Sequence, residues 1–273
     1  MKIIITGTTS GIGEATAHAL ASQGHQLWLL NRNAAKSALQ LQELQAKFPA
    51  SEVHAIQCDL SIMASVNHAL TLLRKIGPID LLINNAGGMT PSKQISEDGI
   101  EMQFHMNHLG HFQLTMGLLP QLLEAKAKII NISSEAHRAA KLNLNNLQLE
   151  KGWSSFGAYA NAKLCNILFT RALHQRYHKS GLKAYALHPG VVNTGFGNGL
   201  GVFKWVWSLM SPFLISPEKG AATTLFLAEV HKSLPSGNYF KNCKQNEASR
   251  LSYSQELIDG LWLVSEKLLE QRA

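Results

Sequence analysis

The sequence predicts an α/β fold with a doubly wound parallel sheet of about seven strands. Signals typical of buried strands alternate with helix-length amphipathic stretches along the 273-residue chain. Short apolar strands separated by helices are typical of a parallel sheet that is covered on both faces. Right-handed crossover connections then produce the doubly wound arrangement.

Each expected strand is a short apolar run, and each expected helix is a longer stretch with one apolar face. The strands fall at residues 3–6, 26–30, 53–57, 81–84, 129–133, 184–188 and 238–240. The helices fall at residues 12–23, 34–47, 64–75, 104–123, 158–177, 217–230 and 255–269. No internal repeat, low-complexity run or linker composition interrupts this order, so residues 1–273 are expected to form one domain.

Composition and charge narrow the class of protein. Hydrophobic residues make up 45% of the chain and charged residues 16%, which excludes a disordered chain or a collagen-like fibre. The 25 basic residues outnumber the 18 acidic ones, and they are dispersed along the sequence. This dispersed positive charge suits an anionic cofactor or substrate, so no nucleic-acid partner is expected.

Cysteine usage and the hydrophobic segments predict a cytoplasmic location. Cys58, Cys165 and Cys243 lie far apart and form no CxxC pair, so neither a disulfide framework nor a zinc knuckle is expected. The chain reads as a strand from its second residue, which leaves no room for a signal peptide. The most apolar segment, residues 202–215, is too short to span a bilayer, so no transmembrane segment is expected.

A glycine-rich turn, TGTTSGIG at residues 6–13, follows the first expected strand and precedes a helix. Glycines allow a tight turn and let a pyrophosphate approach the backbone, where the helix N-terminus supplies N–H donors. The spacing is GxxxGxG, which differs from the GxGxxG of other dinucleotide folds. A turn without a ligand is the alternative, but the position directly after the first strand favours a cofactor site.

The end of the second expected strand favours NADP(H). An acidic residue here would hold the ribose 2′-hydroxyl of NAD, whereas this chain has Asn31 followed by Arg32. A guanidinium can pair with a 2′-phosphate through two hydrogen bonds. Asp59, after the third strand, is placed to accept from the adenine amine. The alternative is that Arg32 is a solvated loop cation.

Tyr159 and Lys163 stand four residues apart on one expected helix and therefore on one face. A tyrosine of ordinary pKa, about 10, is a poor base at neutral pH. A nearby cation lowers that pKa and makes proton transfer to a carbonyl or from an alcohol feasible. Taken alone, the pair could equally be a surface Tyr/Lys pair.

Further motifs complete a recognisable order. The chain reads TG at 6–7, GIG at 11–13, NNAG at 84–87, INISS at 130–134, Tyr159 with Lys163, and HPG at 188–190. This order resembles the short-chain dehydrogenase/reductase family over nearly the whole chain, which implies a Rossmann fold and hydride transfer with a nicotinamide cofactor. Four stretches resemble its retinol-dehydrogenase-like branch: residues 107–112, the long segment between Ser134 and Tyr159, residues 163–166, and residues 236–240 with Cys243.

The resemblance implies a role for each catalytic residue. Tyr159 is the general acid/base, and Lys163 lowers its pKa and binds the nicotinamide ribose. Ser134 hydrogen-bonds the substrate oxygen, with Ser133 as a structural partner, and Asn107 holds a proton-relay water. The cofactor-binding residues implied, together with Tyr159 and Lys163, are Gly7, Thr9, Ser10, Gly11, Ile12, Gly13, Asn31, Arg32, Asp59, Leu60, Asn85, Ala86, Gly87, Pro189, Gly190, Val192 and Thr194. Two positions depart from the family pattern: Ala162 where many members have serine, and Asn31 before Arg32.

His105, His108 and His111 resemble a metal cluster only in their spacing. On an α-helix, steps of three residues turn by about 300° each and spread the three rings around the cylinder. No metal site is therefore expected.

Residues 195–216 are expected to form a lid over the substrate. The stretch 201–213 carries two tryptophans, two phenylalanines and a methionine, which suits a lipophilic carbonyl or alcohol substrate. An oligomer contact or a patch on a membrane surface would show the same composition.

The leading functional prediction is an NADP(H)-dependent carbonyl reductase or alcohol dehydrogenase. A C=C reductase acting on a conjugated substrate and a non-catalytic NADP(H)-sensing regulator are the alternatives. Family members often pair through the helices that carry Asn107 and Tyr159, so a homo-oligomer is one expectation. The apolar stripe of Leu164, Ile167 and Leu168 fits a core or an interface equally.

Overall fold

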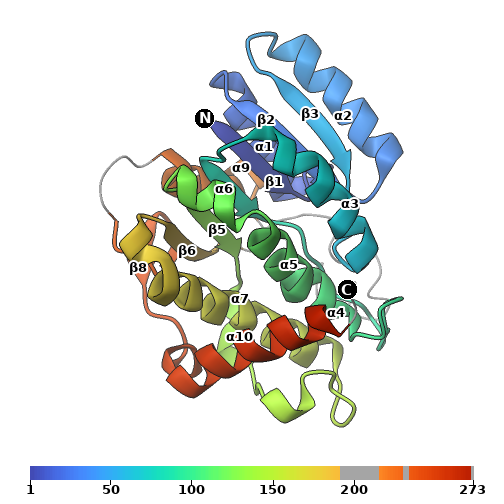
Figure 1. The fold of residues 1–273 in the computed structure, drawn as a ribbon, viewed down its shortest axis with the longest axis vertical. Helices are drawn as coiled ribbons and strands as arrows, with labels where there is room; N and C mark the ends of the chain where they lie inside the picture. The colour runs from blue at the N-terminus through green and yellow to red at the C-terminus, as the bar shows by residue number, and fades with distance from the viewer. Residues whose placement is uncertain (191–214, 230–233, 272–273) are drawn as a thin grey trace.

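Eight strands form one sheet in the computed structural model, which describes residues 1–190, 215–229 and 234–271. The strand order is β3-β2-β1-β4-β5-β6-β7-β8 (Figure 1). Neighbouring strands are parallel except for the antiparallel pair β7–β8. The strands are β1 (Lys2–Thr6), β2 (Gln26–Asn31), β3 (Val53–Gln57), β4 (Leu81–Asn84), β5 (Lys128–Ile132), β6 (Lys183–His188), β7 (Asn238–Lys241) and β8 (Lys244–Asn246). The predicted doubly wound α/β fold is confirmed.

The central strands are buried on both faces, as the apolar runs predict. Ile3, Ile4 and Ile5 of β1 have no exposed surface. Because successive side chains of a strand point to opposite faces, Ile4 joins one hydrophobic core and Ile3 and Ile5 join the other. Each face of the sheet therefore has its own core.

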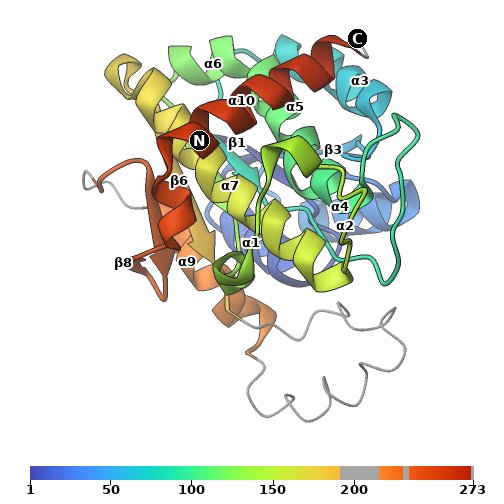
Figure 2. The same ribbon diagram turned by 90° about the horizontal axis from the view of Figure 1, so that it is seen from below.

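Helices cover both of these cores (Figure 2). The longer ones are α1 (Gly11–Ser22), α2 (Ala34–Lys47), α3 (Met63–Leu73), α5 (Gly110–Gly117), α7 (Ser155–Tyr177), α9 (Pro217–Glu229) and α10 (Gln255–Glu270). Helices α1, α2 and α9 contribute to one core, and α3, α5 and α7 contribute to the other, with α10 packed against α7. Leu164, Ile167 and Leu168 of α7 are fully buried, so this stripe belongs to the core.

The antiparallel strand β8 was not predicted. Its residues, Lys244–Asn246, are polar and exposed, so no apolar run marks them. Asn242 and Cys243, which connect β7 to β8, have positive φ angles of 51° and 58°. Two consecutive left-handed residues are typical of the tight turn of a two-residue hairpin.

The helical stretch expected at residues 104–123 is present, but it is not one regular helix. The segment is divided into α4 (Met102–Phe104), a π-helical turn η2 (His105–Leu109), α5, and α6 (Leu119–Glu124). The Asn107 side chain donates from Nδ2 to the Gln103 carbonyl at 2.8 Å. That carbonyl is the ordinary acceptor for the Asn107 backbone N–H, so the side chain competes with the helical ladder and opens it.

Three predictions concern a transmembrane segment, the substrate lid and the number of domains. Among the described residues, no helix is long and apolar enough to cross a membrane. Most of the expected lid, residues 195–216, lies outside the described residues. The lid and the one-domain organisation stay predictions.

Candidate active site

Four predicted catalytic residues meet at the carboxyl ends of β4 and β5. Asn107 comes from η2, Ser134 is the second residue after β5, and Tyr159 and Lys163 lie one turn apart on α7. The hydroxyl groups of Tyr159 and Ser134 are hydrogen-bonded to each other, and Lys163 Nζ lies 5.4 Å from the centre of the Tyr159 ring. A Cβ atom on Gly87 would lie 2.4 Å from Asn107 Oδ1 and 3.1 Å from Lys163 Nζ, so a glycine allows this close approach.

Helix α7 is fixed at the site by polar contacts. Its N-terminus is capped by Ser154, which accepts from the Gly157 N–H. Ser133 donates from Oγ to the Lys163 carbonyl at 2.7 Å, and Lys163 donates from Nζ to the Ile132 carbonyl at 3.2 Å. The end of β5 and the turn of α7 that carries Lys163 are therefore joined directly.

Burial sets the protonation of the Tyr/Lys pair. It raises the pKa of Tyr159 to about 12, although the hydrogen bond with Ser134 acts in the opposite direction. It also lowers the pKa of Lys163 to about 8, because this residue is only 3% exposed and its ammonium loses hydration. Desolvation therefore determines the pKa of Tyr159 in this structure, and the expected lowering by Lys163 is not seen.

Asn107 is completely buried, and the loop after β4 holds its amide. Its Oδ1 accepts from the Gly88 N–H at 3.1 Å, and its Nδ2 donates to the Gly88 carbonyl at 2.9 Å. Its own carbonyl lies 3.1 Å from Nδ1 of His111, whose Nε2 lies 2.8 Å from Thr6 Oγ1. His111 thus connects Asn107 to the end of β1.

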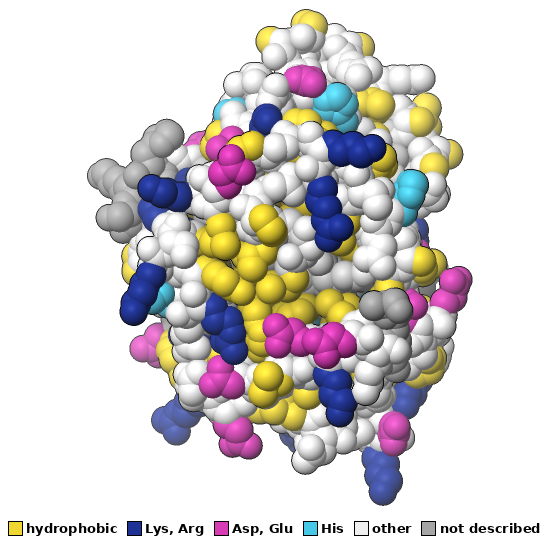
Figure 3. Space-filling view, in the orientation of Figure 1, with side chains coloured by type: hydrophobic (Ala, Val, Ile, Leu, Met, Phe, Trp, Pro, Cys, Tyr) yellow, Lys and Arg dark blue, Asp and Glu magenta, His cyan; other side chains and the backbone are white. Residues whose placement is uncertain are grey.

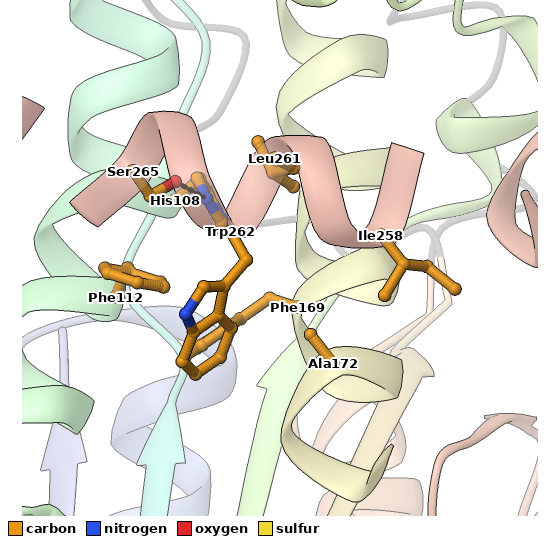
Figure 4. A pocket seen from close by; sticks show the side chains of 8 residues that line it. All are labelled: His108, Phe112, Phe169, Ala172, Ile258, Leu261, Trp262 and Ser265. Atoms are coloured by element: carbon orange, nitrogen blue, oxygen red, sulfur yellow. Dashed lines mark hydrogen bonds between the residues drawn. The ribbon is translucent and has the colours of Figure 1, made fainter. Parts of the chain in front are cut away.

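The three histidines of this region have separate partners. His105 is hydrogen-bonded to Ser96 at 2.8 Å, and His108 to Ser265 of α10 at 3.1 Å, whereas His111 bridges Thr6 and Asn107. Figure 4 shows the His108 ring beside Ser265, under α10. Within the described ranges, no group of three or more His, Cys, Asp or Glu residues could hold a metal ion.

The glycine-rich turn has the conformation that the sequence predicts. Gly7 and Gly11 have φ angles of 69° and 59°, which favour glycine. A Cβ on Gly13 would lie 2.0 Å from the Gly7 carbonyl oxygen. Ser10, at the start of α1, is exposed, and its side chain makes no capping hydrogen bond with the described residues. The N–H groups of the first turn of α1 therefore have no acceptor from that side chain. These donors and the tight backbone fit the pyrophosphate of a dinucleotide.

Asn31 and Arg32 are adjacent in sequence but have different surroundings. Asn31 is 2% exposed and accepts from the Thr8 N–H at 2.7 Å, while its Nδ2 donates to Ser37 at 3.0 Å. Its side chain therefore holds the backbone of the glycine-rich turn at Thr8. The Arg32 side chain is 76% exposed, with Nε 4.0 Å from a carboxylate oxygen of Asp59, at the rim of the expected adenosine site.

Of the remaining predicted cofactor residues that lie outside the glycine-rich turn, Asn85 and Ala86 contact this turn, and the others lie elsewhere or outside the described residues. Asn85 donates from Nδ2 to the carbonyls of Thr6 and Gly7 at 2.8 and 2.9 Å, and the Ala86 N–H donates to Thr6 Oγ1. Leu60 is buried, with its carbonyl against Gly110. Thr9 and Ile12 are half-buried in the turn, Pro189 and Gly190 follow β6, and Val192 and Thr194 lie outside the described residues.

Several polar residues that support the site were not predicted. Gln40 of α2 donates to the Thr8 carbonyl, and Ser37 supports Asn31. His137 and His188 contact the backbone around Ser134. His188 belongs to the HPG motif at residues 188–190. Neither that motif nor the spacing of the histidines predicted the contacts of His137 and His188.

Comparison with known proteins identifies the family of the chain. Residues 1–201 match the sequence model of the short chain dehydrogenase family. Mouse retinol dehydrogenase 12 is 38% identical over 270 residues, which cover 98% of this chain and 85% of that protein. The human WW domain-containing oxidoreductase is 34% identical over 284 residues, covering 99% of this chain and 68% of that protein.

Solved structures share the fold. An uncharacterised protein from Mycobacterium paratuberculosis superposes with a TM-score of 0.81 at 29% identity, covering 98% of this chain and 93% of that one. An NADPH-bound carbonyl reductase from chicken fatty liver has a TM-score of 0.69 at 23% identity, covering 90% and 98%. The family match and these relatives lead to one conclusion: the chain belongs to the short-chain dehydrogenase/reductase family of oxidoreductases, in its retinol-dehydrogenase-like branch.

Proposed function

We propose that this protein is an NADP(H)-dependent oxidoreductase that acts on a carbonyl or alcohol group of a lipophilic substrate. The observation that carries the proposal is the Tyr159 hydroxyl, hydrogen-bonded to Ser134 and one helical turn from the buried Lys163. Tyr159 is then the proton donor, Ser134 its hydroxyl partner and Lys163 the nearby cation. The three residues lie near the glycine-rich turn, which fits a dinucleotide pyrophosphate.

The bound cofactor supplies or accepts a hydride at nicotinamide C4. Ser134 holds the substrate oxygen by a hydrogen bond. With a pKa of about 12, Tyr159 is a neutral phenol at physiological pH and donates its proton to the oxygen of the alcohol being formed. In the reverse direction the same oxygen, in its ionised phenolate form, accepts the proton of the alcohol.

Lys163 and Asn107 support this proton transfer. The Lys163 ammonium stabilises negative charge on the phenol oxygen as the proton leaves, because an opposite charge nearby favours the ionised form. It is held by the Ile132 carbonyl, and Asn107 is held by Gly88. Both groups therefore keep fixed positions during turnover, and we assign Asn107 to the expected relay water.

NADP(H) is favoured over NAD(H) by the exposed Arg32 at the adenosine rim. Asp59, whose Oδ1 accepts from the Ser61 N–H at 2.9 Å, remains the proposed partner of the adenine amine. The relatives named retinol dehydrogenase support a lipophilic alcohol or aldehyde as the substrate.

A homo-oligomer and a cytoplasmic location stay predictions. Figure 3 shows hydrophobic side chains gathered in the middle of one face. Apolar residues of α5 and α6, including Met116, Leu119 and Leu123, are half-buried. Helix α10 packs against α7, one of the two helices through which pairing is expected. Light scattering and cell fractionation test these two predictions.

The proposed function is tested by measuring NADPH and NADH oxidation with retinoid, aromatic and long-chain aldehydes and ketones. Turnover with NADPH that is lost in Tyr159→Phe, while NADPH still binds, supports the proposal. Normal turnover by Tyr159→Phe contradicts it. Product analysis separates carbonyl reduction from C=C reduction, and tight NADPH binding without turnover points to a cofactor sensor.

A further inference from the structure

Two imidazole rings hold the peptide bond between Ser134 and Glu135. Nδ1 of His137 lies 2.6 Å from the Ser134 carbonyl oxygen, and the Glu135 N–H donates to Nδ1 of His188 at 3.3 Å. The Ser134 carbonyl also accepts from the backbone N–H of His137 at 3.0 Å. The serine proposed to hold the substrate oxygen therefore has its backbone fixed on both sides.

The partners of His137 allow one protonation state. Its Nε2 accepts from the Ser249 N–H at 3.0 Å, and a backbone N–H is always a donor. Its Nδ1 faces a carbonyl oxygen, which is always an acceptor. The ring is consequently neutral, with the proton on Nδ1. It has no exposed surface, and burial lowers its pKa, which favours the same neutral form.

The other end of this bridge lies in the C-terminal part of the chain. Ser249 follows β8, outside the residues 1–201 that match the family model. The same region is fastened to the short helix η3 (Glu135–Ala139) by Arg138, which donates to the Glu247 carbonyl at 2.6 Å. Tyr239 of β7, which donates to Glu135 at 2.7 Å, adds a further contact, and its ring packs edge-on against His137.

We propose that His137 is a positioning residue for the reaction, which holds Ser134 in place by donating from Nδ1 to its carbonyl, while the Ser249 N–H keeps the ring proton on that nitrogen. Ser134 uses its Oγ twice, as acceptor from the Ala136 N–H at 3.2 Å and as partner of Tyr159. A rotation of the Ser134 peptide would move this hydroxyl away from Tyr159. This role rests on the proposed function, because it acts through Ser134.

Two substitutions at His137 separate positioning from packing. Asparagine places an amide N–H near the former Nδ1 and keeps the donor to Ser134, whereas glutamine reaches the former Nε2 and keeps only the Ser249 contact. We expect kcat to fall about tenfold or more in His137→Gln and less than about threefold in His137→Asn. The Kd for NADPH stays unchanged in both variants. Equal losses of kcat in the two variants, or a loss only in His137→Asn, would overturn the proposal.

A spectroscopic measurement makes the test independent of turnover and of variant folding. The ring nitrogens of His137 are observed by ¹⁵N NMR in the intact chain at neutral pH. The expected pattern is a protonated Nδ1 and an unprotonated Nε2, and the opposite tautomer or a cationic ring overturns the proposal. If the wild-type chain turns over no substrate, the proposed function fails, and this pattern still decides whether His137 forms the bridge.

Discussion

The ammonium nitrogen of Lys163 lies 5.4 Å from the centre of the Tyr159 ring and donates to the Ile132 carbonyl at 3.2 Å. Burial favours the uncharged form of both side chains. It raises the pKa of Tyr159 and lowers that of Lys163. Of these two groups, Lys163 is therefore the one whose charge changes nearer to physiological pH.

A loss of activity at high pH follows from the pKa of Lys163. Burial lowers that pKa to about 8, so the ammonium is present below this pH and is lost as the pH rises through it. We expect kcat for reduction with NADPH to be constant near neutrality and to fall above about pH 8. Lys163→Arg keeps its charge at every accessible pH and should move this decline to higher pH. A wild-type profile that stays flat to about pH 10 would contradict the role of Lys163.

Arg32 is expected to set the preference for the phosphorylated cofactor. Removing its guanidinium in Arg32→Ala should raise the Kd for NADPH about tenfold and leave that for NADH unchanged, because only NADPH carries a 2′-phosphate. Calorimetric titration measures both affinities. Arg250→Ala is a matched control, since it removes the same charge from an exposed position on η8 (Arg250–Tyr253). Equal weakening of NADH and NADPH binding in Arg32→Ala would show that the contact is not with the 2′-phosphate.

Gly13→Ala should damage the cofactor turn although alanine is the better helix former. The gain in helix propensity is about 1 kcal/mol. Against this, the new Cβ would lie 2.0 Å from the Gly7 carbonyl oxygen and 2.5 Å from Asn85 Nδ2. Relieving such an overlap costs about 1–3 kcal/mol, so a lower melting temperature and weaker NADPH binding are expected. Gly88→Ala is the control for stability, because its nearest neighbour would be the flexible end of Met106 at 3.5 Å. A variant of Gly13 as stable as wild type with full NADPH affinity would refute the geometry of the turn.

Most of the fold was predictable because its signals are local. The apolar runs of β1 and β5 are long enough to identify buried strands, and the Tyr159–Lys163 spacing identifies one helix face. β8 was missed because its three residues are polar and are ordered by pairing with β7. The π-helical turn was missed because it depends on one side-chain hydrogen bond, from Asn107 to Gln103.

The supporting contacts of the site were not predictable for a different reason. Asn31 lies 23 residues from its partner Thr8, and His137 lies 112 residues from Ser249. Nothing in the local sequence names the partner of such a residue, since the fold alone brings the two together. The proposed catalytic and cofactor residues can be identified from sequence motifs. The residues that hold them in place can be identified only from the tertiary structure.

Trp262 of α10 is expected to be a main source of stability for the covering helix. It is 5% exposed, and its ring centre lies 5.1 Å from that of Phe112 and 6.0 Å from that of Phe169. Figure 4 shows the three side chains close together. Arg176 lies over the Trp262 ring at 4.3 Å. Trp262→Ala should lower the free energy of unfolding by about 3–5 kcal/mol, measured by denaturant titration, because it leaves a large cavity.

The neighbouring residue provides the control for this last prediction. Leu263 on the same helix is 62% exposed, so Leu263→Ala should change the free energy of unfolding by less than about 0.5 kcal/mol. If the two substitutions cost the same, α10 does not pack on α5 and α7 through Trp262. A large effect of Trp262→Ala with retained NADPH binding would show that the helix stabilises this side of the molecule independently of the glycine-rich turn, which leads into α1 and the opposite core.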